Sequence, residues 1–340
     1  MAEKMSTFGS YEQEFVSSGN LSRSTPPSVS IIIVTYNGRR FLDDCLSSLA
    51  FQTFQNFEVI LVDNGSSDES VSFVRKKYPS VVIIENGVNL GFAGGTNTGI
   101  RVAKGEFILA LNNDTIADPS FLEEIVRPMQ ADSHVGVCGS KMVFPDKRLN
   151  STGICISRSG AAWDRGMFED DRGQYDREEE VFGACAGAAL YRKAMLDRIG
   201  LLDEDFFAYM EDVDLAYRAR LAGWKCIYVP TARIVHYHGG TAGYKSDLAV
   251  YYGNRNGVWY VLKVFPASML LMYLPWILGR SICVIPYYSL KGKTRAILKS
   301  KIDAVKGVGK MIRKRSGISR AVPDDEIRKW MAVWAKIPGK

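Results

Sequence analysis

The sequence predicts an α/β fold in which a mostly parallel sheet is flanked by helices, followed by a helical region at the C-terminus. Two observations carry this prediction. Runs of apolar and β-branched residues alternate with helical patterns in the first third of the chain, and polar turns follow the runs. In addition, 46% of the 340 residues are apolar, which is enough for one large domain with an appendage.

The predicted elements follow one another in β-α order. Residues 30–34 form a β-branched run that stops at a polar turn, as expected of a buried parallel strand. A helix follows, with apolar residues at helical spacing (41, 42, 45, 46 and 49). The other predicted strands are residues 57–62, 81–84 and 107–111, and Ser67 is the expected N-cap of the helix behind the second strand. This succession indicates a doubly wound, Rossmann-like sheet.

Ligands of such sheets bind beyond the carboxyl ends of the strands. Three polar turns fall at those ends, at residues 35–37, 63–66 and 112–114, so we expect them to face one crevice. Between them, residues 89–97 place glycines ahead of a helix, where bare backbone N–H groups can approach phosphate oxygens. The pattern weakens after about residue 130, and we expect a loop or short excursion in the acid-rich segment 163–180.

Two acidic residues are candidates for chemistry. Asp114 directly follows the fourth strand, where its carboxylate could ligate a hard cation that bridges a diphosphate. Asp212 lies at the start of a predicted helix, where it could deprotonate an attacking hydroxyl. Both also have plain structural interpretations, because Asn and Asp form turns and acidic residues favour the first turn of a helix. The same helix is expected to carry an ion pair between Asp214 and Arg218 on its side.

Five motifs give these residues a context: VTYN at 34–37, VDNGSSD at 62–68, NLGFAGG at 89–95, LNND at 111–114 and MEDVDL at 210–215. Their order resembles that of family 2 glycosyltransferases of the GT-A fold, and the chain is most similar to the rhamnosyltransferase-like branch. The resemblance covers residues 28–265. Five motifs in the same order make it specific.

The resemblance implies an inverting sugar transfer, in which Asp212 is the general base on the acceptor hydroxyl and Asp114 ligates a divalent cation, Mn²⁺ or Mg²⁺. It implies that His236 completes the metal site or touches the diphosphate, with His238 as an alternative; structural roles for these histidines stay open. The donor, a dTDP- or UDP-sugar, would contact residues of the turns and of the glycine segment: Thr35, Tyr36, Asn37, Asp63, Asn64, Asn89, Gly91, Phe92, Gly94, Asn97, Asn112 and Asn113.

One position departs from the family pattern. The Asp-x-Asp of the family appears here as Asn112-Asn113-Asp114, so that an amide replaces one carboxylate. An amide still offers an oxygen to a cation, but it carries no charge. We therefore expect cation binding that is weaker than in relatives with two carboxylates, or that is shared with His236.

The C-terminal region combines an apolar stretch with a basic one. Residues 264–279 are uncharged but contain Pro266 and Pro275, and Arg280 separates them from a second apolar stretch at 281–290. A membrane span requires roughly 20 apolar residues, so the run is short and interrupted. We expect this stretch to lie in the membrane interface or to re-enter it; a helical hairpin packed on the domain is the alternative. Residues 291–320 hold eleven Lys/Arg against one acid, Asp303. An anionic membrane surface is the expected partner and nucleic acid is not, because the aromatics ahead of the basic stretch are not interleaved with Arg and Gly.

The expected organisation has four parts. Residues 1–27 are mostly small or polar, lack an apolar signal core and are expected to form a disordered tail. Residues 28–250 form the GT-A domain, residues 251–320 the apolar and then basic helical region at the membrane interface, and residues 321–340 a C-terminal tail. Six widely spaced cysteines indicate neither a zinc site nor a disulfide framework, which favours the cytoplasmic face of the cell membrane.

Together these features predict an enzyme that moves a deoxyhexose such as rhamnose to a hydroxyl of a lipid-linked or cell-surface saccharide. An oxidoreductase is disfavoured because no GxGxxG follows the first strand. A sugar nucleotidyltransferase is disfavoured because no Gly-rich turn with Arg and Lys follows it. The remaining alternative is a catalytically weakened sugar-binding or scaffold subunit at the membrane, against which the intact Asp212 argues.

Overall fold

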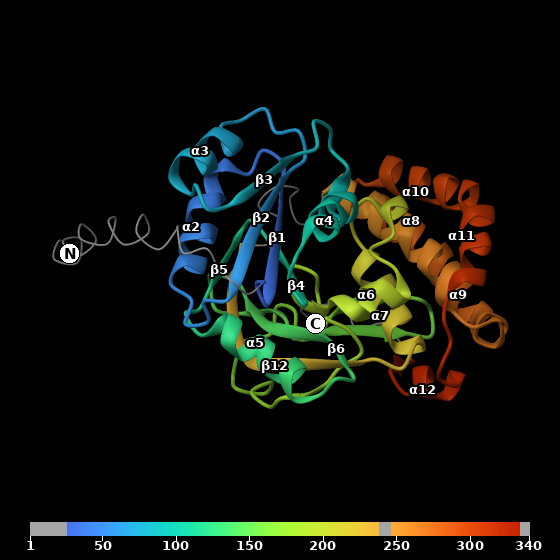
Figure 1. Ribbon diagram of the computed structural model, residues 1–340. Coiled ribbons are helices and arrows are strands. Elements are labelled where there is room, and N and C mark those ends of the chain that lie inside the picture. The colour runs from blue at the N-terminus through green and yellow to red at the C-terminus, as the bar shows by residue number, and fades with distance from the viewer. Residues whose placement is uncertain (1–25, 238–245, 334–340) are drawn as a thin grey trace.

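The computed structural model describes residues 26–237 and 246–333 (Figure 1). The four predicted strands are present and parallel in the order β3-β2-β1-β4, which confirms the doubly wound half of the sheet. Their bounds are β1 (Val29–Thr35), β2 (Phe57–Asp63), β3 (Val82–Glu85) and β4 (Phe107–Asn112). The tail expected at residues 1–27 lies almost entirely outside the described residues.

Helices cover both faces of this half-sheet, because successive side chains of a strand point to opposite faces. Ile31 and Ile33 of β1 share a core with α2, α3 and α5, whereas Ile32 shares a core with α4, α6 and α7. The expected cap at Ser67 is wrong, since α3 begins at Ser70 without a side-chain cap and the Ser67 N–H donates to Asn37 Oδ1 (2.8 Å). The bounds are α2 (Arg39–Ala50), α3 (Ser70–Lys77), α4 (Gly91–Val102), α5 (Phe121–Ala131), α6 (Lys193–Ile199) and α7 (Glu211–Leu221).

The other half of the sheet is mixed. β11 (Ala188–Arg192) runs antiparallel between β4 and β6 (Val135–Val143), and β12 (Lys225–His236) runs parallel to β6. The weak pattern after residue 130 conceals β6, whose nine residues are all buried. The strand includes Lys141, whose ammonium is neutralised by Asp171 and Asp176 at 2.8 and 2.6 Å. Shorter strands complete the fold: β5 (Thr115–Ala117), β7 (Leu149–Ser151), β8 (Ile154–Ser157), β9 (Ala162–Asp164) and β10 (Glu179–Glu180).

The C-terminal helices are part of the fold, on the side of the sheet opposite α2 and α3 (Figure 1). α8 begins at Asp247, so the domain boundary expected at residue 250 falls inside a helix. Buried side chains of α8 share a core with α7, and β13 pairs with β8, so the tail expected from residue 321 contributes ordered elements. The bounds are α8 (Asp247–Val264), α9 (Ala267–Ser289), α10 (Thr294–Lys306), α11 (Val308–Lys314), α12 (Asp324–Arg328) and β13 (Met331–Ala332).

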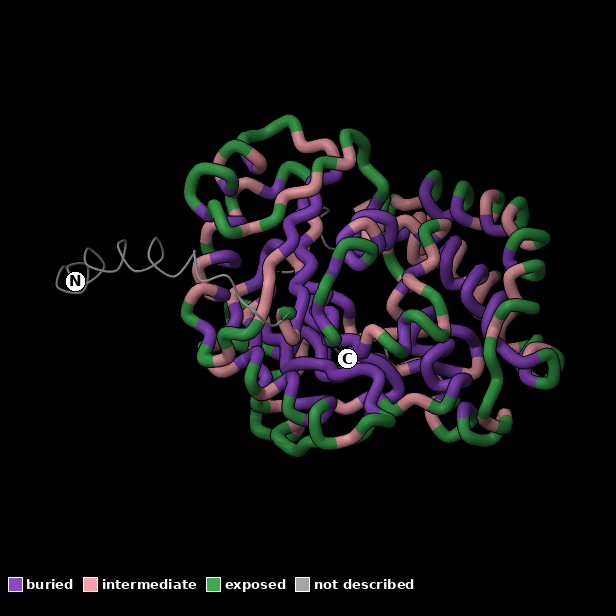
Figure 2. The backbone as a smooth tube through the Cα atoms, in the orientation of Figure 1, coloured by how far each residue is buried: buried purple, intermediate pink, exposed green. Residues whose placement is uncertain are grey.

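Helix α9 corrects the expectation of a short, interrupted apolar stretch. It is continuous for 23 residues although it contains Pro275 and Pro286, because a proline removes one donor without ending a helix whose neighbouring turns remain bonded. Among the described residues, it is the one helix long and apolar enough to cross a membrane. Its inner face packs on α8 and α10, but its outer face is exposed, with Leu271 at 76% (Figure 2).

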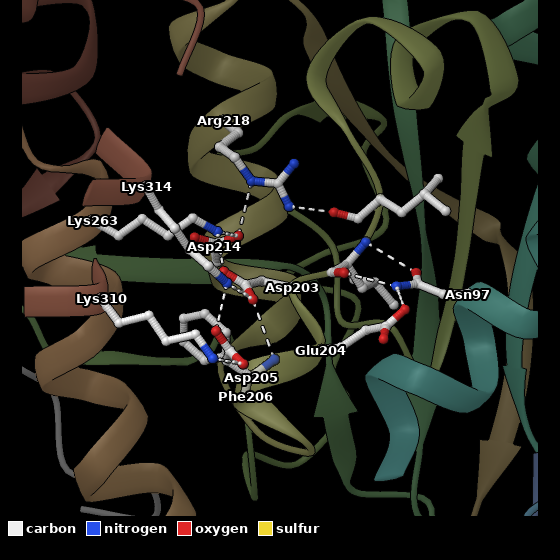
Figure 3. A network of polar contacts seen from close by, with 12 residues as sticks. Asn97, Asp203, Glu204, Asp205, Phe206, Asp214, Arg218, Lys263, Lys310 and Lys314 are labelled. Atoms are coloured by element: carbon white, nitrogen blue, oxygen red, sulfur yellow. Dashed lines mark hydrogen bonds and ion pairs between the residues drawn. The ribbon is translucent and has the colours of Figure 1, made fainter. Parts of the chain in front are cut away.

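A network of buried charges joins α7 to the C-terminal helices (Figure 3). Asp214 of α7 is fully buried and accepts from Arg218 Nε (2.8 Å) and from Lys263 Nζ of α8 (2.8 Å). The same Lys263 ammonium contacts Asp203 at 2.8 Å, and Lys314 of α11 reaches Asp203 from the other side. The expected Asp214–Arg218 pair is therefore present, but it lies in the core and not on the side of the helix. Lys314, which belongs to the basic stretch of residues 291–320, thus stabilises the fold.

Lys263→Met should lower the free energy of unfolding by about 3–5 kcal/mol, because it leaves two buried carboxylates with one cation fewer. Chemical denaturation of the full chain measures this. The control is Lys306→Met, which removes an exposed pair with Asp303 and should cost less than about 1 kcal/mol. Equal effects of the two changes would mean that the buried network does not hold α7 to α8.

The pH dependence of that difference follows from Asp203. Burial alone would raise its pKa, but Lys263 and Lys314 bring the pKa of Asp203 down to about 2. A lowered pKa adds stability above the unfolded value of about 4, and this contribution disappears as the pH falls toward 2. The deficit of Lys263→Met should therefore be largest near neutral pH and shrink below about pH 4, as denaturation at several pH values would show.

Candidate active site

Three polar turns meet at the carboxyl ends of β1, β2 and β4, as the sequence predicts. Asn113 Nδ2 donates to Thr35 Oγ1 (3.0 Å), which joins the turns behind β4 and β1. Asn37 accepts from the N–H of Ser67, which joins the turns behind β1 and β2. Asn64 Nδ2 donates to the Gly91 carbonyl (2.9 Å) and so ties the second turn to the start of α4. The turns therefore form one continuous rim.

Asp63, at the end of β2, has a carboxylate oxygen that accepts no hydrogen bond from the described residues. Its Oδ2 accepts from the N–H groups of Gly65 (3.1 Å) and Ser66 (3.0 Å), which fixes the orientation of the carboxylate. Its Oδ1 is buried and has no hydrogen-bond partner within the described part of the chain. Buried acceptors are almost always satisfied, so Oδ1 is positioned to accept from a ligand. Tyr36 beside it is 40% exposed and available to a flat ring.

The glycines at the start of α4, which were expected to approach phosphate oxygens, allow close packing between α4 and β1. A Cβ at Gly95 would lie 2.7 Å from Val34 Cγ1, and one at Gly99 would lie 2.5 Å from Ile32 Cγ2, so these glycines let α4 approach β1. The Gly91 N–H donates to Asn89 Oδ1 (2.9 Å) and is not free for a phosphate.

Asn97 also departs from the expected donor contact. Its amide nitrogen donates to the Leu202 carbonyl (2.8 Å) and to Glu204 (2.9 Å), while its Oδ1 accepts from the Leu202 N–H. These bonds tie α4 to the segment that leads into α7 (Figure 3). Phe92 is half-buried against the core on the same side of the sheet, and Gly94 lies within the buried part of α4.

Asp114 and His236 lie together. His236 ends β12, whose antiparallel register with β5 places it opposite Thr115, and the Asp114 carbonyl accepts from the Tyr237 N–H. Nε2 of His236 is 3.2 Å from Oδ1 of Asp114, and both side chains are buried. The alternative residue, His238, lies outside the described residues.

The hydrogen bonds around His236 determine which ring nitrogen faces Asp114 with a lone pair. Nδ1 donates to Asn150 Oδ1 (2.8 Å), so in the neutral ring Nε2 is unprotonated, and Asn112 Nδ2 lies 3.1 Å from it. Two ligands at right angles around a cation, each ~2.1 Å from it, are separated by roughly 3 Å. The Nε2–Oδ1 pair therefore fits a divalent cation.

The protein supplies only part of such a coordination sphere. In residues 26–237 and 246–333, no group of three or more His, Cys, Asp or Glu side chains could hold a metal. Asn112 presents its amide at the position where the family pattern has a carboxylate. Further ligands would come from water or from a substrate oxygen, as is usual for Mg²⁺ and for catalytic sites with open positions.

Asp212 begins α7 at the same edge of the sheet. Its Oδ2 accepts from the Ala186 N–H (3.3 Å), and the next residue, Gly187, accepts from the Asn112 N–H (2.9 Å). One short segment therefore touches both Asp212 and the end of β4. The Asp212 side chain remains partly accessible, and burial raises its pKa. Burial and the Asp212 charge raise the pKa of the neighbouring Glu211 to about 8, so Glu211 is protonated near neutral pH.

Sequence reasoning missed Asp164 and Asn150. Asp164 of β9 lies within electrostatic range of Asp212 and His236: burial and the charge of Asp212 raise its pKa to about 6, while His236 lowers it. Asn150 of β7 orients the His236 ring. Neither belongs to a motif, and both come from the region in which the sequence pattern is weakest. The acid-rich composition of residues 163–180 was the only available signal, and it did not single out Asp164.

The segment ahead of Asp212 has an uncommon backbone. Phe207, Tyr209 and Met210 have positive φ values of 65°, 68° and 74°, each of which costs of order 1 kcal/mol or more for a residue with a side chain. Asn256 of α8 compensates, because its Nδ2 lies 2.9, 2.9 and 2.7 Å from the carbonyl oxygens of Phe206, Ala208 and Tyr209. Helix α8 therefore fixes the conformation that presents Asp212.

The sheet, the rim of turns and the two separated carboxylates define the GT-A glycosyltransferase fold. Among solved structures, the chain resembles the mannosyltransferase PcManGT from Pyrobaculum calidifontis in complex with GDP-Man and Mn²⁺ (TM-score 0.53, 18% identity, 87% of this chain and 86% of that one). It also resembles GalNAc-T7 with UDP, GalNAc and Mn²⁺ (TM-score 0.60, 16% identity, 84% and 57%). Because both identities are below 25%, these similarities show a shared fold and nothing further.

The chain belongs to glycosyl transferase family 2, whose family profile matches residues 30–200. Among curated proteins, it is 25% identical over 309 residues to the N-acetylglucosaminyl-diphospho-decaprenol L-rhamnosyltransferase of Mycobacterium tuberculosis. The alignment covers 82% of this chain and 97% of that relative. The predicted membership in a rhamnosyltransferase-like branch of the family is thereby confirmed.

Direct binding of Mn²⁺ to the full chain, followed by electron paramagnetic resonance, should depend on Asp114 and His236. We expect Asp114→Asn and His236→Ala each to weaken Mn²⁺ binding by at least 10-fold, and Asn150→Leu to weaken it by about 10-fold through loss of the ring orientation. The control is His134→Ala, which removes an exposed histidine paired with Asp132. If His134→Ala weakened binding as much as His236→Ala, the cation would not bind at the proposed pair.

Proposed function

We propose that this protein is an inverting, metal-dependent glycosyltransferase. It moves a deoxyhexose such as rhamnose from a dTDP- or UDP-sugar to a hydroxyl of a lipid-linked or cell-surface saccharide. The observation that supports the proposal is the Ala186-Gly187 segment, which hydrogen-bonds both Asp212 and Asn112 at the end of β4, two residues before Asp114. The name of the mycobacterial relative supports the sugar and the lipid-linked acceptor.

In the proposed reaction, Asp212 takes the proton of the acceptor hydroxyl. The hydroxyl oxygen attacks the anomeric carbon from the side opposite the diphosphate, and the bond between that carbon and the diphosphate oxygen breaks with its electron pair leaving on the diphosphate. A divalent cation held by Asp114 and His236 would offset the charge of that leaving group. Because burial raises the pKa of Asp212, its ionised form is a stronger base than an exposed carboxylate.

Glu211 supports this assignment of roles. It is buried, and its raised pKa keeps it neutral at the pH at which Asp212 is ionised. Only one of the two adjacent carboxyl groups therefore carries charge, as expected where like charges share a site. The rim residues Thr35, Asp63 and Asn64 are proposed to hold the nucleotide.

We also propose that the enzyme works at the cytoplasmic face of the cell membrane. The long exposed apolar face of α9 supports this location, and so does the lipid-linked acceptor named for the mycobacterial relative. Contact with anionic lipids is proposed for the exposed lysines of α10, such as Lys299 and Lys306. Lys310 and Lys314 of α11 contribute less, because they pair with Asp203 and Asp205 within the protein.

Asp212→Asn should reduce sugar transfer by about 10²–10⁴-fold, because the base is removed while the shape is kept. Binding of the nucleotide-sugar, measured by calorimetry, should change less than about threefold. The matched control is Asp197→Asn on the exposed side of α6, which should leave both quantities unchanged. Full transfer by Asp212→Asn would exclude Asp212 as the base. Nucleotide-sugar binding without transfer in the wild type would favour a sugar-binding subunit.

Asp164→Asn should move the acidic limb of the pH profile of kcat/KM to lower pH. The negative charge of Asp164 disfavours ionisation of Asp212, and this coupling is reciprocal, so removing it lowers the pKa of Asp212. A limb that stays in place would show that the two carboxyl groups do not share a pocket.

The same variant has a stability readout. The raised pKa of Asp164, about 6, contributes stability below the unfolded value of about 4, and this contribution is lost as the pH rises through 6. The variant Asp164→Asn should therefore become more stable relative to the wild type between about pH 4 and pH 7. Its free energy of unfolding minus that of the wild type should increase over this range.

A further inference from the structure

Two partly buried cations, Arg280 of α9 and Lys301 of α10, lie on helices that pack against each other and against α8. The Arg280 guanidinium of α9 lies against Gly257 of α8, where a Cβ would be 3.5 Å from Nη1 and 3.7 Å from Nη2. Lys301 is on α10, one turn from the buried Ile297 and close to the faces that pack on α8 and α9. Both side chains are only partly accessible to solvent.

Among the described residues, no acidic side chain pairs with Arg280 or Lys301. Residues 247–314 contain only two acids, Asp247 and Asp303. Asp247 pairs with Lys293, while Asp303 accepts from Lys306 and from the Tyr251 hydroxyl. Neither Arg280 nor Lys301 has a hydrogen bond or ion pair with any of the described residues, whereas Arg255 and Lys263 of α8 are fully bonded.

An unpaired, partly buried cation is unfavourable, and two neighbouring ones are more so. Burial lowers the pKa of Arg280, and burial together with the Arg280 charge lowers the pKa of Lys301 to about 8. Elsewhere in the same helices the fold satisfies its buried cations. The exception therefore indicates that an anion from outside the protein binds here.

The surroundings indicate what carries the anion. Large apolar side chains are exposed on the three helices beside the pair: Leu271, Met272, Leu274, Leu278, Ile282, Tyr287 and Leu290 on α9 and its end, Leu298, Ile302 and Val305 on α10, and Ile312 on α11. An exposed apolar surface of this extent marks a membrane or partner site, and Leu290 is 90% exposed. An anion attached to an apolar chain matches both features.

We propose that Arg280 and Lys301 bind the phosphate of a membrane lipid, whose acyl or prenyl chain lies along the exposed apolar faces of α9 and α10. This inference rests on the proposed membrane association and gives it a site. Arg280 offers two parallel N–H donors to phosphate oxygens, and Lys301 adds a point charge. The α8 helix that borders the site also carries Asn256, which holds the backbone ahead of Asp212.

Octyl phosphate is a suitable soluble probe, used below its micelle concentration with the full chain and measured by calorimetry. It should bind at least 10-fold more tightly than inorganic phosphate and than octanol, because the site combines charge with apolar surface. The variant Arg280→Gln/Lys301→Gln should lose at least 10-fold in octyl phosphate affinity. The matched control Lys76→Gln/Lys104→Gln, which removes two exposed lysines outside the C-terminal helices, should lose less than twofold.

Three outcomes would overturn the proposal. Equal binding of inorganic phosphate would mean a free phosphate site, equal binding of octanol would mean a purely apolar surface, and an equal loss in the control would mean diffuse surface charge. Nucleotide-sugar binding, measured on the same samples, separates this test from the proposed function. If the nucleotide-sugar fails to bind while octyl phosphate binds, the proposed function is wrong and this site remains.

Thermal unfolding without added phosphate gives an independent measurement. Arg280→Gln/Lys301→Gln removes two unpaired like charges, so its melting temperature should equal or exceed that of the wild type. Flotation with phosphatidylcholine vesicles that contain phosphatidic acid should then show at least 10-fold weaker binding for this folded variant. A lower melting temperature would mean that the two cations have partners within the protein, and the proposal would fall.

Discussion

The contact of Lys263 with Asp214 and Asp203 is the interaction on which the arrangement of the active site depends. Asp214 lies two residues from Asp212 on α7, and its carboxylate is fully buried. Arg218 of α7 supplies one cation to Asp214, and Lys263 of α8 supplies a second that also pairs with Asp203. Because buried carboxylates are costly without such partners, Lys263 stabilises the contact between α7 and α8. The GT-A domain and the helical region after it are therefore joined in one unit of stability, although the motifs proposed for catalysis all lie in the first.

A second contact from α8 explains how Asp212, the proposed base, is presented. Three residues with positive φ precede Asp212, and such a backbone persists only where surrounding groups over-determine it. Asn256 does so because its Nδ2 lies within hydrogen-bond distance of the carbonyl oxygens of Phe206, Ala208 and Tyr209. Since α8 also packs against α9 and α10, any surface that binds those helices bears on the element that holds the base. Membrane contact and catalysis would thus share one helix, without a moving part.

Sequence analysis predicts those features that local patterns determine. The β-branched runs predict the parallel strands, and the polar turns predict the rim that joins Thr35 to Asn113. Sequence analysis does not predict features that depend on contacts between residues far apart in the chain. Lys141 can lie in the buried strand β6 because Asp171 and Asp176 neutralise it, and Asp164 reaches the pocket through strand pairing that no motif records. Helix α9 continues through its prolines because the turns on either side of each proline remain bonded.

The proposed chemistry requires that Glu211 stay neutral while Asp212 is charged when the acceptor arrives. Glu211, Asp212 and Asp164 lie close enough for their charges to interact, and burial disfavours ionisation of all three. Backbone N–H groups of Ala186 and Val213 bond to Asp212, whereas Glu211 Oε2 is buried without a partner in the described chain. Hydrogen bonds to a carboxylate favour its charged form. The negative charge therefore settles on Asp212, at a helix N-terminus that further stabilises it, and the acceptor proton has one destination.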